Sequence, residues 1–108
     1  MALGTEISVW ELKALHDARA PVVVIDVREP AELAIARLDF AHHIPMGAIP
    51  ERLDEIPKDA DVVVMCHSGV RSDRVAHFLR ERGYASVANL AGGIDSWSAE
   101  IDPTVPVY

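Results

Sequence analysis

Two runs of β-branched residues stand out from the otherwise mixed apolar and polar pattern of the chain. One lies in PVVVIDVR, which begins at Pro21, and the other is VVVM, residues 62–65. Neither run alternates with polar residues, which is typical of a strand buried on both faces, as in a parallel sheet. AHHIPMG, from Ala41, and SVANL, from Ser86, predict two further strands.

Helical patterns lie between these strands. Ser8 and Glu11 have the spacing of a capping box and predict a helix through ELKALHDAR. Pro30 suits the first position of a short helix, PAELAIAR, and IPERLDEIP, residues 49–57, predicts another short helix between prolines. The sequence GGIDSW, from Gly92, predicts the start of a last short helix.

The helix after the second valine run has the clearest pattern. From Ser72 onward apolar residues recur at helical spacing, and Gly83 stands where a helix would end. Strands that alternate with helices at such short intervals predict an α/β fold with an open, mostly parallel sheet and helices on both faces. We expect one domain, residues 1–108, because a chain of this length is large enough for one core and too short for two.

Composition and charge narrow the class of protein. Half of the residues are hydrophobic, 25% are charged, and the net charge is −7, so we expect no nucleic-acid or membrane partner. A single cysteine cannot form an internal disulfide, and the first ten residues lack the basic segment and apolar run of a signal peptide. No apolar stretch approaches the roughly 20 residues of a membrane-spanning helix. We therefore expect a cytoplasmic protein.

The only cysteine, Cys66, directly follows the second valine run. In open parallel sheets, ligands bind beyond the carboxyl ends of the strands, where connections enter helices. The connection HSGVR leads into the helix predicted to begin near Ser72, and the unpaired amides of the loop and of the first helical turn can point inward as a cradle for an anion. Gly69 lets the backbone turn tightly, and Arg71 adds a positive charge that can clamp an anionic substrate.

The position of Cys66 predicts a reactive thiol. The thiolate is the reactive form of cysteine, and helix N-termini and nearby cations lower the pKa of a thiol from its usual value of about 8.5. A buried, inert cysteine at the end of a core strand is the alternative interpretation. The glycine, the arginine, the helix start and the polar sequence HSG favour a nucleophile. Adjacent residues often point in different directions, so a direct role for His67 stays open.

Four segments resemble those of the rhodanese-like sulfurtransferases, in the order expected for that family. CHSGVRS, residues 66–72, resembles the Cys-His-x-Gly-x-Arg-Ser active-site loop of single-domain bacterial members. VVVIDVREPAEL resembles the family's strand that ends in Asp-Val-Arg, HIPMGAIPERL its next short strand and the segment after it, and NLAGGIDSWSAEIDP its Gly-Gly-x-x-x-Trp segment. The similarity extends from about Ile7 to Tyr108 and implies a rhodanese-like sheet of about five strands.

The chain departs from the family pattern in one place. Many family members have Gly-His-Ile-x-Gly-Ala just before the short strand, where this chain has ARLDFA, residues 36–41. Aligning that motif with HIPMGA, residues 43–48, would need inserted residues. The details of this turn are therefore not implied by the resemblance, whereas the cysteine loop matches.

The resemblance implies a thiosulfate:cyanide type of sulfurtransferase with Cys66 as its catalytic residue. The Cys66 thiolate would take a sulfane sulfur from thiosulfate or a low-molecular-weight persulfide, and a thiol, a protein or cyanide would then accept that sulfur. Arg71 would bind the departing sulfite. The resemblance implies no metal and no organic cofactor. The loop residues expected to bind the substrate are His67, Ser68, Gly69, Val70, Arg71 and Ser72.

Two other functions stay open. Some domains of this fold are non-catalytic binding or regulatory modules, although these commonly lack the cysteine. Phosphatases and arsenate reductases that share the sheet architecture are the other alternative, with a Cys-x5-Arg loop. Only four residues separate Cys66 from Arg71, which gives a tighter cradle that suits a sulfur atom better than a phosphoryl group.

Asp26 and Arg28 follow the first buried strand and are therefore candidates near the catalytic end of the sheet. Pairing with each other to fix the turn into the next helix is the simpler interpretation, so we expect them to support the site rather than react. His42 and His43 are adjacent on a predicted strand, so they point to opposite faces and cannot share a metal ion.

Two tryptophans and a pair of glycines complete the pattern. Trp10 and Trp97 each lie in an amphipathic helical segment and are predicted to be core or packing residues. Gly92 and Gly93 predict a tight strand-to-helix turn close to the cysteine loop.

Overall fold

The computed structural model describes residues 3–108, so the first two residues of the predicted domain lie outside the described residues. A five-stranded sheet runs through the molecule in the order β1-β5-β4-β2-β3, and every pair of neighbouring strands is parallel. This confirms the predicted α/β fold. The strands are β1 (Glu6–Ile7), β2 (Val22–Asp26), β3 (His42–His43), β4 (Asp61–Met65) and β5 (Val87–Leu90).

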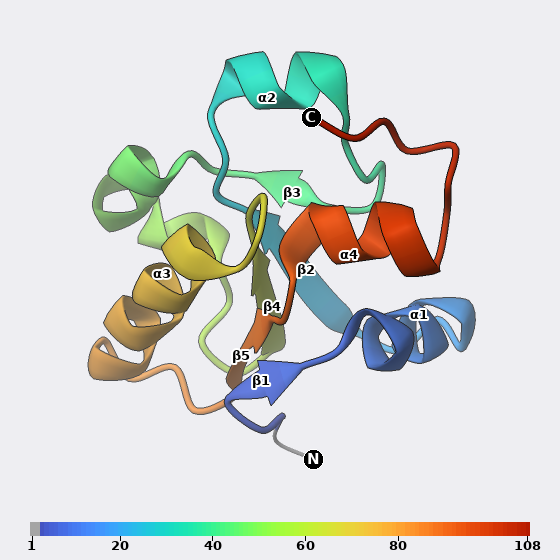
Figure 1. The fold of residues 1–108 in the computed structure, drawn as a ribbon. Helices are drawn as coiled ribbons and strands as arrows, with labels where there is room; N and C mark the ends of the chain where they lie inside the picture. The colour runs from blue at the N-terminus through green and yellow to red at the C-terminus, as the bar shows by residue number, and fades with distance from the viewer. Residues whose placement is uncertain (1–2) are drawn as a thin grey trace.

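Helices cover both faces of the sheet, as predicted. In Figure 1, α1 and α4 lie on one side of the sheet, and α3 and the 3₁₀ helices lie on the other. The short helix α2 lies beyond the carboxyl ends of the strands, next to the last residues of the chain. The helices are α1 (Val9–Asp17), α2 (Pro30–Ile35), α3 (Val70–Glu81) and α4 (Gly93–Glu100), with 3₁₀ helices η1 (Met46–Glu51) and η2 (Leu53–Glu55).

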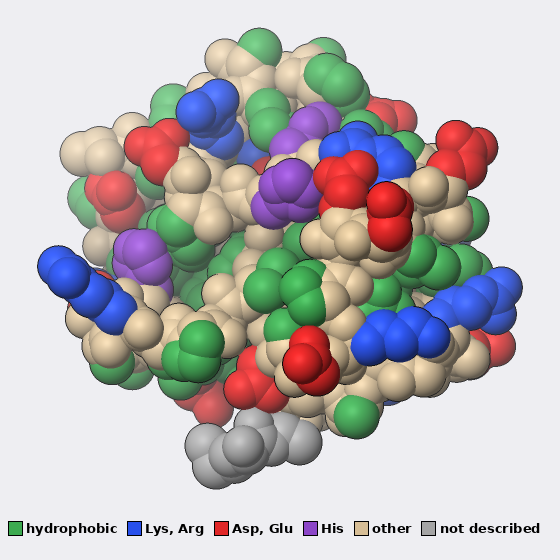
Figure 2. Space-filling view, turned by 180° about the vertical axis from the view of Figure 1, so that it is seen from behind, with side chains coloured by type: hydrophobic (Ala, Val, Ile, Leu, Met, Phe, Trp, Pro, Cys, Tyr) green, Lys and Arg blue, Asp and Glu red, His purple; other side chains and the backbone are tan. Residues whose placement is uncertain are grey.

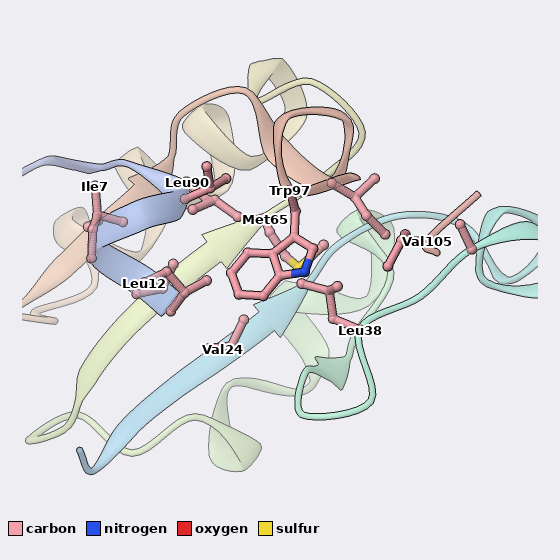
Figure 3. Packing of buried hydrophobic residues seen from close by; sticks show 13 residues of the cluster. Ile7, Leu12, Val24, Leu38, Met65, Leu90, Trp97 and Val105 are labelled. Atoms are coloured by element: carbon pink, nitrogen blue, oxygen red, sulfur yellow. The ribbon is translucent and has the colours of Figure 1, made fainter. Parts of the chain in front are cut away.

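The central strands β2 and β4 send alternate side chains into two separate cores. On the α1 and α4 side, Val24 and Met65 pack with Trp97, which is only 5% exposed (Figure 3). On the other side, Ile25 and Val64 pack with residues of α3. Because both faces of these strands are buried, neither run needs polar alternation, which explains the two valine runs.

The predicted start of the first helix is confirmed in detail. The Ser8 hydroxyl accepts a hydrogen bond from the Glu11 amide (3.1 Å), and the Glu11 carboxylate accepts one from the Ser8 amide (3.0 Å). Pro30 is the first residue of α2, where its missing amide proton costs nothing because that amide would have no partner within the helix.

Two local predictions differ from the structure, and one strand was not predicted. IPERLDEIP forms two 3₁₀ segments rather than one α-helix, because Pro50 lies inside the first of them and cannot donate the hydrogen bond that an α-helix needs. The helix predicted from Ser72 begins two residues earlier, at Val70. β1 was not predicted because its two residues are too few to carry a periodic signal.

The interpretation of Trp10 as a core residue is wrong, whereas that of Trp97 is confirmed. Trp10 is 55% exposed, and its indole Nε1 donates a hydrogen bond to Glu100 at the end of α4. Trp10, the second residue of α1, faces outward because Val9 and Leu12 form the buried stripe of that helix.

No helix within residues 3–108 has both the length and the apolar character needed to cross a membrane. On the face of the molecule in Figure 2, basic and acidic side chains are interspersed over the surface.

Candidate active site

Cys66 is the first residue after β4, at the carboxyl end of the central part of the sheet, and its loop leads into α3 (Figure 1). The backbone of Gly69, the residue before α3, has φ +106°, a left-handed conformation that side-chain-bearing residues rarely adopt. This turn folds the loop back over the sulfur atom of Cys66. The predicted place of the cysteine, at a strand end and a helix entrance, is confirmed.

The Cys66 sulfur is buried yet surrounded by hydrogen-bond donors. The residue is 1% exposed, the Gly69 amide donates to Sγ at 3.1 Å, and the Ser72 hydroxyl lies 3.3 Å from Sγ. Burial alone raises the pKa of the thiol, but hydrogen bonds from the Ser72 side chain and from the amides of Ser72, Gly69 and Ser68 outweigh it and lower the pKa. The loop thus provides the amide cradle predicted from the sequence, and that cradle favours the thiolate.

Asn89, on the neighbouring strand β5, binds both the Gly69 turn and the Ser72 hydroxyl. Its amide nitrogen donates to the Gly69 carbonyl at 3.1 Å, and its amide oxygen accepts from the Ser72 hydroxyl at 2.5 Å. Asn89 is only 4% exposed, so both contacts are shielded from water. The role of Asn89 was not predicted from the sequence, although a lone amide in the predicted strand SVANL is the kind of signal that marks a buried polar contact.

The residues just after the Gly92-Gly93 turn bind the backbone of the cysteine loop. The Ile94 amide donates to the Cys66 carbonyl at 3.0 Å, and the Asp95 amide donates to the His67 carbonyl at 3.1 Å. Gly93 permits this approach, because a Cβ atom there would lie 2.4 Å from the Cys66 carbonyl oxygen. The predicted closeness of the Gly92-Gly93 turn to the cysteine loop is confirmed.

Arg71 does not stand free over the loop, because Glu32 of α2 already binds it. Two nitrogens of the guanidinium donate to the two carboxylate oxygens of Glu32 at 2.7 and 2.8 Å. Hydrogen bonding to Arg71 lowers the pKa of Glu32 to about 2, so this carboxylate is charged at neutral pH. Glu32 also accepts a hydrogen bond from the Tyr108 hydroxyl at 2.9 Å. None of these partners was predicted from the sequence.

The His67 ring is turned toward Tyr108 and α4. The two rings stack with centroids 4.1 Å apart and planes at 10° to each other. Nε2 of His67 is 3.3 Å from an Asp95 carboxylate oxygen but lacks the geometry of a hydrogen bond to it. The other two loop side chains, Ser68 and Val70, are exposed, and Ser68 acts on the sulfur through its amide.

Asp26 and Arg28 pair with each other at the end of β2, as the simpler interpretation predicted. Both are buried, and the Arg28 guanidinium donates to the Asp26 carboxylate at 2.7 Å. Further contacts from Arg28 to the Ala36 carbonyl (2.8 Å) and the Tyr108 hydroxyl (2.8 Å) tie β2, α2 and the end of the described chain together. Such a buried pair fixes the strand-to-helix turn.

The histidines of β3 point to opposite sides, as expected. His43 Nε2 lies 2.6 Å from the Arg28 carbonyl oxygen, whereas His42 Nε2 contacts Glu55 at 2.8 Å. Among residues 3–108, no three histidine, cysteine or acidic side chains gather as a set that could hold a metal ion.

Comparison with known proteins agrees with this geometry. The sequence model of the rhodanese-like domain matches residues 8–100. The chain belongs to the rhodanese-like domain family. This confirms the resemblance carried by the four sequence motifs.

Several relatives of this rhodanese-like domain carry informative names. A protein of Allochromatium vinosum named "Sulfurtransferase" is 45% identical over 84 residues, which are 78% of this chain and 78% of that protein. The crystal structure of a rhodanese-like domain protein from Staphylococcus aureus has 30% sequence identity and a TM-score of 0.83, and the match covers 97% of this chain and 99% of that one. Family membership and these relatives support sulfur transfer by an enzyme of rhodanese type as the general class of activity.

A larger relative contains a similar domain. A structure described as an NAD-dependent persulfide reductase from A. fulgidus is 35% identical, with a TM-score of 0.70, over 86% of this chain but only 16% of that one. The rhodanese-like domain thus also occurs as a small part of a longer protein.

Proposed function

We propose that this chain is a single-domain cytoplasmic sulfurtransferase, residues 1–108, that carries a sulfane sulfur as a persulfide on Cys66. The observation that carries the proposal is the environment of Cys66 Sγ. A buried thiol at a strand end receives hydrogen bonds from a loop amide and from a serine, and its pKa is lowered. A structural core cysteine needs none of these donors.

In the first half-reaction, the Cys66 thiolate attacks the sulfane sulfur of a donor. With thiosulfate, a new S–S bond forms to Cys66, the original S–S bond breaks, and sulfite leaves with the bonding electron pair. With a low-molecular-weight persulfide, the leaving group is a thiolate, which takes the proton of the donor's outer sulfur and becomes a thiol. The moving sulfur exchanges one S–S bond for another and keeps its oxidation state. The transfer therefore needs no oxidant, metal or organic cofactor.

In the second half-reaction, an acceptor attacks the outer sulfur and Cys66 leaves as a thiolate. The acceptor is a thiol, a protein or cyanide, which would give thiocyanate. Since Cys66 is the only cysteine of the chain, no second thiol of the chain can attack the persulfide and form an internal disulfide with Cys66. The sulfur therefore has to pass to another molecule.

The loop residues have distinct roles in this scheme. The amides of Ser68, Gly69 and Ser72, which lower the pKa of the thiol, also stabilise the negative outer sulfur of the persulfide. Arg71 is paired with Glu32, which reduces the positive charge that it offers to a donor, and His67 and Val70 are also assigned to substrate binding. Arg28, paired with Asp26, reaches the loop through the Tyr108 hydroxyl, because the Tyr108 ring stacks on His67.

The decisive experiment is the intact mass of the reduced protein before and after incubation with thiosulfate or glutathione persulfide. We expect a gain of one sulfur atom, removed again by cyanide with release of thiocyanate. Cys66→Ser should gain nothing while keeping a native circular dichroism spectrum, because the hydroxyl is close in size to the thiol.

Two outcomes would replace the proposal. If neither donor adds sulfur to the wild-type protein, the chain is a non-catalytic binding module of this fold. If the protein instead hydrolyses an aryl phosphate in a Cys66-dependent way, the phosphatase alternative holds despite the four-residue spacing in the loop.

A further inference from the structure

We propose that Glu32 is a specificity-determining residue, which occupies Arg71 and so directs this site toward sulfur donors that release a neutral thiol and away from the thiosulfate dianion. The inference rests on the proposed function and adds the class of donor. The ion pair between Arg71 of α3 and Glu32 of α2 lies outside the sequence motif of the cysteine loop.

The Glu32 carboxylate is held in place on four sides. Its two oxygens accept from the two Arg71 nitrogens at 2.7 and 2.8 Å, one also accepts from the Tyr108 hydroxyl at 2.9 Å, and the other accepts from the Glu29 amide at 2.8 Å. Only 19% of the Glu32 side chain and 32% of the Arg71 side chain are exposed. A fork-to-fork pair of this kind uses the Arg71 face that would otherwise bind a planar or tetrahedral oxyanion.

The Tyr108 hydroxyl makes this pairing more rigid. It accepts a hydrogen bond from the buried Arg28 guanidinium at 2.8 Å and donates to Glu32. Because its ring also stacks on His67, Tyr108 connects the cysteine loop to the carboxylate that restrains Arg71. The Glu32 side chain therefore cannot move away from Arg71 without losing its hydrogen bonds from the Glu29 amide and the Tyr108 hydroxyl.

The remaining charges near the loop do not compensate for the loss of a free cation. Arg28 is neutralised by the buried Asp26 carboxylate. Asp95 places a carboxylate oxygen 3.3 Å from His67. Arg74, one turn further along α3 than Arg71, lines a pocket on the side of η1, together with Met46, Ile49, Pro50, Val75 and Phe78. The chain as a whole carries a net charge of −7, which also repels a dianion.

These contacts predict different fates for two kinds of donor. Thiosulfate brings two negative charges and releases sulfite, so it needs a free cation beside the cradle. In an alkyl persulfide, the Cys66 thiolate attacks the outer sulfur, the donor S–S bond breaks, and the leaving thiolate takes the proton of that outer sulfur. Its alkyl group carries no charge and makes no demand on Arg71.

The test compares the initial rates at which Cys66 is loaded from thiosulfate and from 2-hydroxyethyl persulfide, followed by intact mass. We expect Glu32→Gln to raise kcat/KM for thiosulfate about tenfold by releasing Arg71, and to change kcat/KM for the alkyl persulfide by less than about twofold. Glutamine still serves at the third position of a helical capping box, so α2 should persist. Glu81→Gln makes the same charge change near the far end of α3 and should alter neither rate.

A double-mutant cycle separates release of Arg71 from a general loss of negative charge. In an Arg71→Ala background, Glu32→Gln should lose its tenfold effect on thiosulfate. An unchanged thiosulfate rate in Glu32→Gln, or a gain of equal size in the Arg71→Ala background, would overturn the inference.

Failure of this inference differs from failure of the proposed function. If the wild-type protein loads sulfur from both donors but Glu32→Gln leaves their ratio unchanged, only the role of Glu32 is wrong. If the wild-type protein loads sulfur from neither donor, the persulfide carrier itself is wrong.

Discussion

The Ser72 hydroxyl lies between two acceptors, Asn89 Oδ1 at 2.5 Å and Cys66 Sγ at 3.3 Å. A hydroxyl has one proton, so it serves one acceptor at a time. Since the Asn89 amide nitrogen is committed to the Gly69 carbonyl, its oxygen must face Ser72. Asn89 and the sulfur therefore compete for one donor.

Ser72→Ala should make the thiol less reactive. Loss of a hydrogen bond to the thiolate, worth about 1.5 kcal/mol, predicts roughly tenfold slower alkylation by iodoacetamide at pH 7. Because the thiolate is the reactive form, the rate rises as pH passes upward through the pKa of Cys66, and this rise should move to higher pH in the variant. Ser68→Ala is the matched control, since only its amide acts on the sulfur. Equal pH profiles for Ser72→Ala and wild type would contradict the role of the hydroxyl.

Gly93→Ala should damage the cysteine loop, whereas Gly47→Ala should be harmless. A Cβ atom on Gly93 would lie 2.4 Å from the Cys66 carbonyl oxygen, and φ there is +57°, whereas a Cβ atom on Gly47 meets nothing within 4 Å. The unfavourable conformation and the clash together predict a loss of about 2 kcal/mol or more in the free energy of unfolding for Gly93→Ala. Urea denaturation measures this loss, and sulfur loading should fall with it. Equal stability of the two variants would show that the turn tolerates a side chain.

The two tryptophans should differ sharply in their contribution to stability. Trp97 is 5% exposed in the core beneath α4, so Trp97→Ala should lower the free energy of unfolding by about 3–5 kcal/mol. Trp10 is 55% exposed, so Trp10→Ala should change it by no more than about 0.5 kcal/mol. Thermal and denaturant unfolding of both variants gives the comparison, and losses of similar size would mean that the Trp10 indole packs more closely than its exposure indicates.

Glu32 should make stability depend on pH in the acid range. Hydrogen bonding to Arg71 lowers the pKa of Glu32 from 4.5 to about 2. A lowered carboxyl pKa stabilises the fold above pH 4.5, and this stabilisation is lost as pH falls to about 2. The difference in free energy of unfolding between wild type and Glu32→Gln should therefore be largest near neutral pH and shrink between pH 5 and pH 2. A difference independent of pH would rule out the ion pair as its source.

The parts of this molecule that local sequence patterns could predict are those governed by neighbouring residues. The two valine runs, the capping box at Ser8 and the placement of Cys66 between a strand and a helix all follow from residues a few positions apart. The helical stripe alone did not settle the exposure of Trp10, because which residues of α1 face the sheet depends on how that helix packs.

The contacts that define the surroundings of the cysteine are instead long-range. Arg71 meets Glu32, Ser72 meets Asn89, and Tyr108 contacts both α2 and His67, pairs that lie far apart in the chain. Each depends on the order of strands in the sheet, which no local pattern fixes. The position of the reactive thiol could therefore be predicted from a sequence motif. The charged groups that surround it could be identified only from the three-dimensional structure.

The carbonyls of Cys66 and His67 bind amides of α4, well after the cysteine in chain order. During synthesis, the thiol leaves the ribosome before the residues that orient its loop. The cysteine loop therefore gains these two backbone hydrogen bonds only when α4 docks.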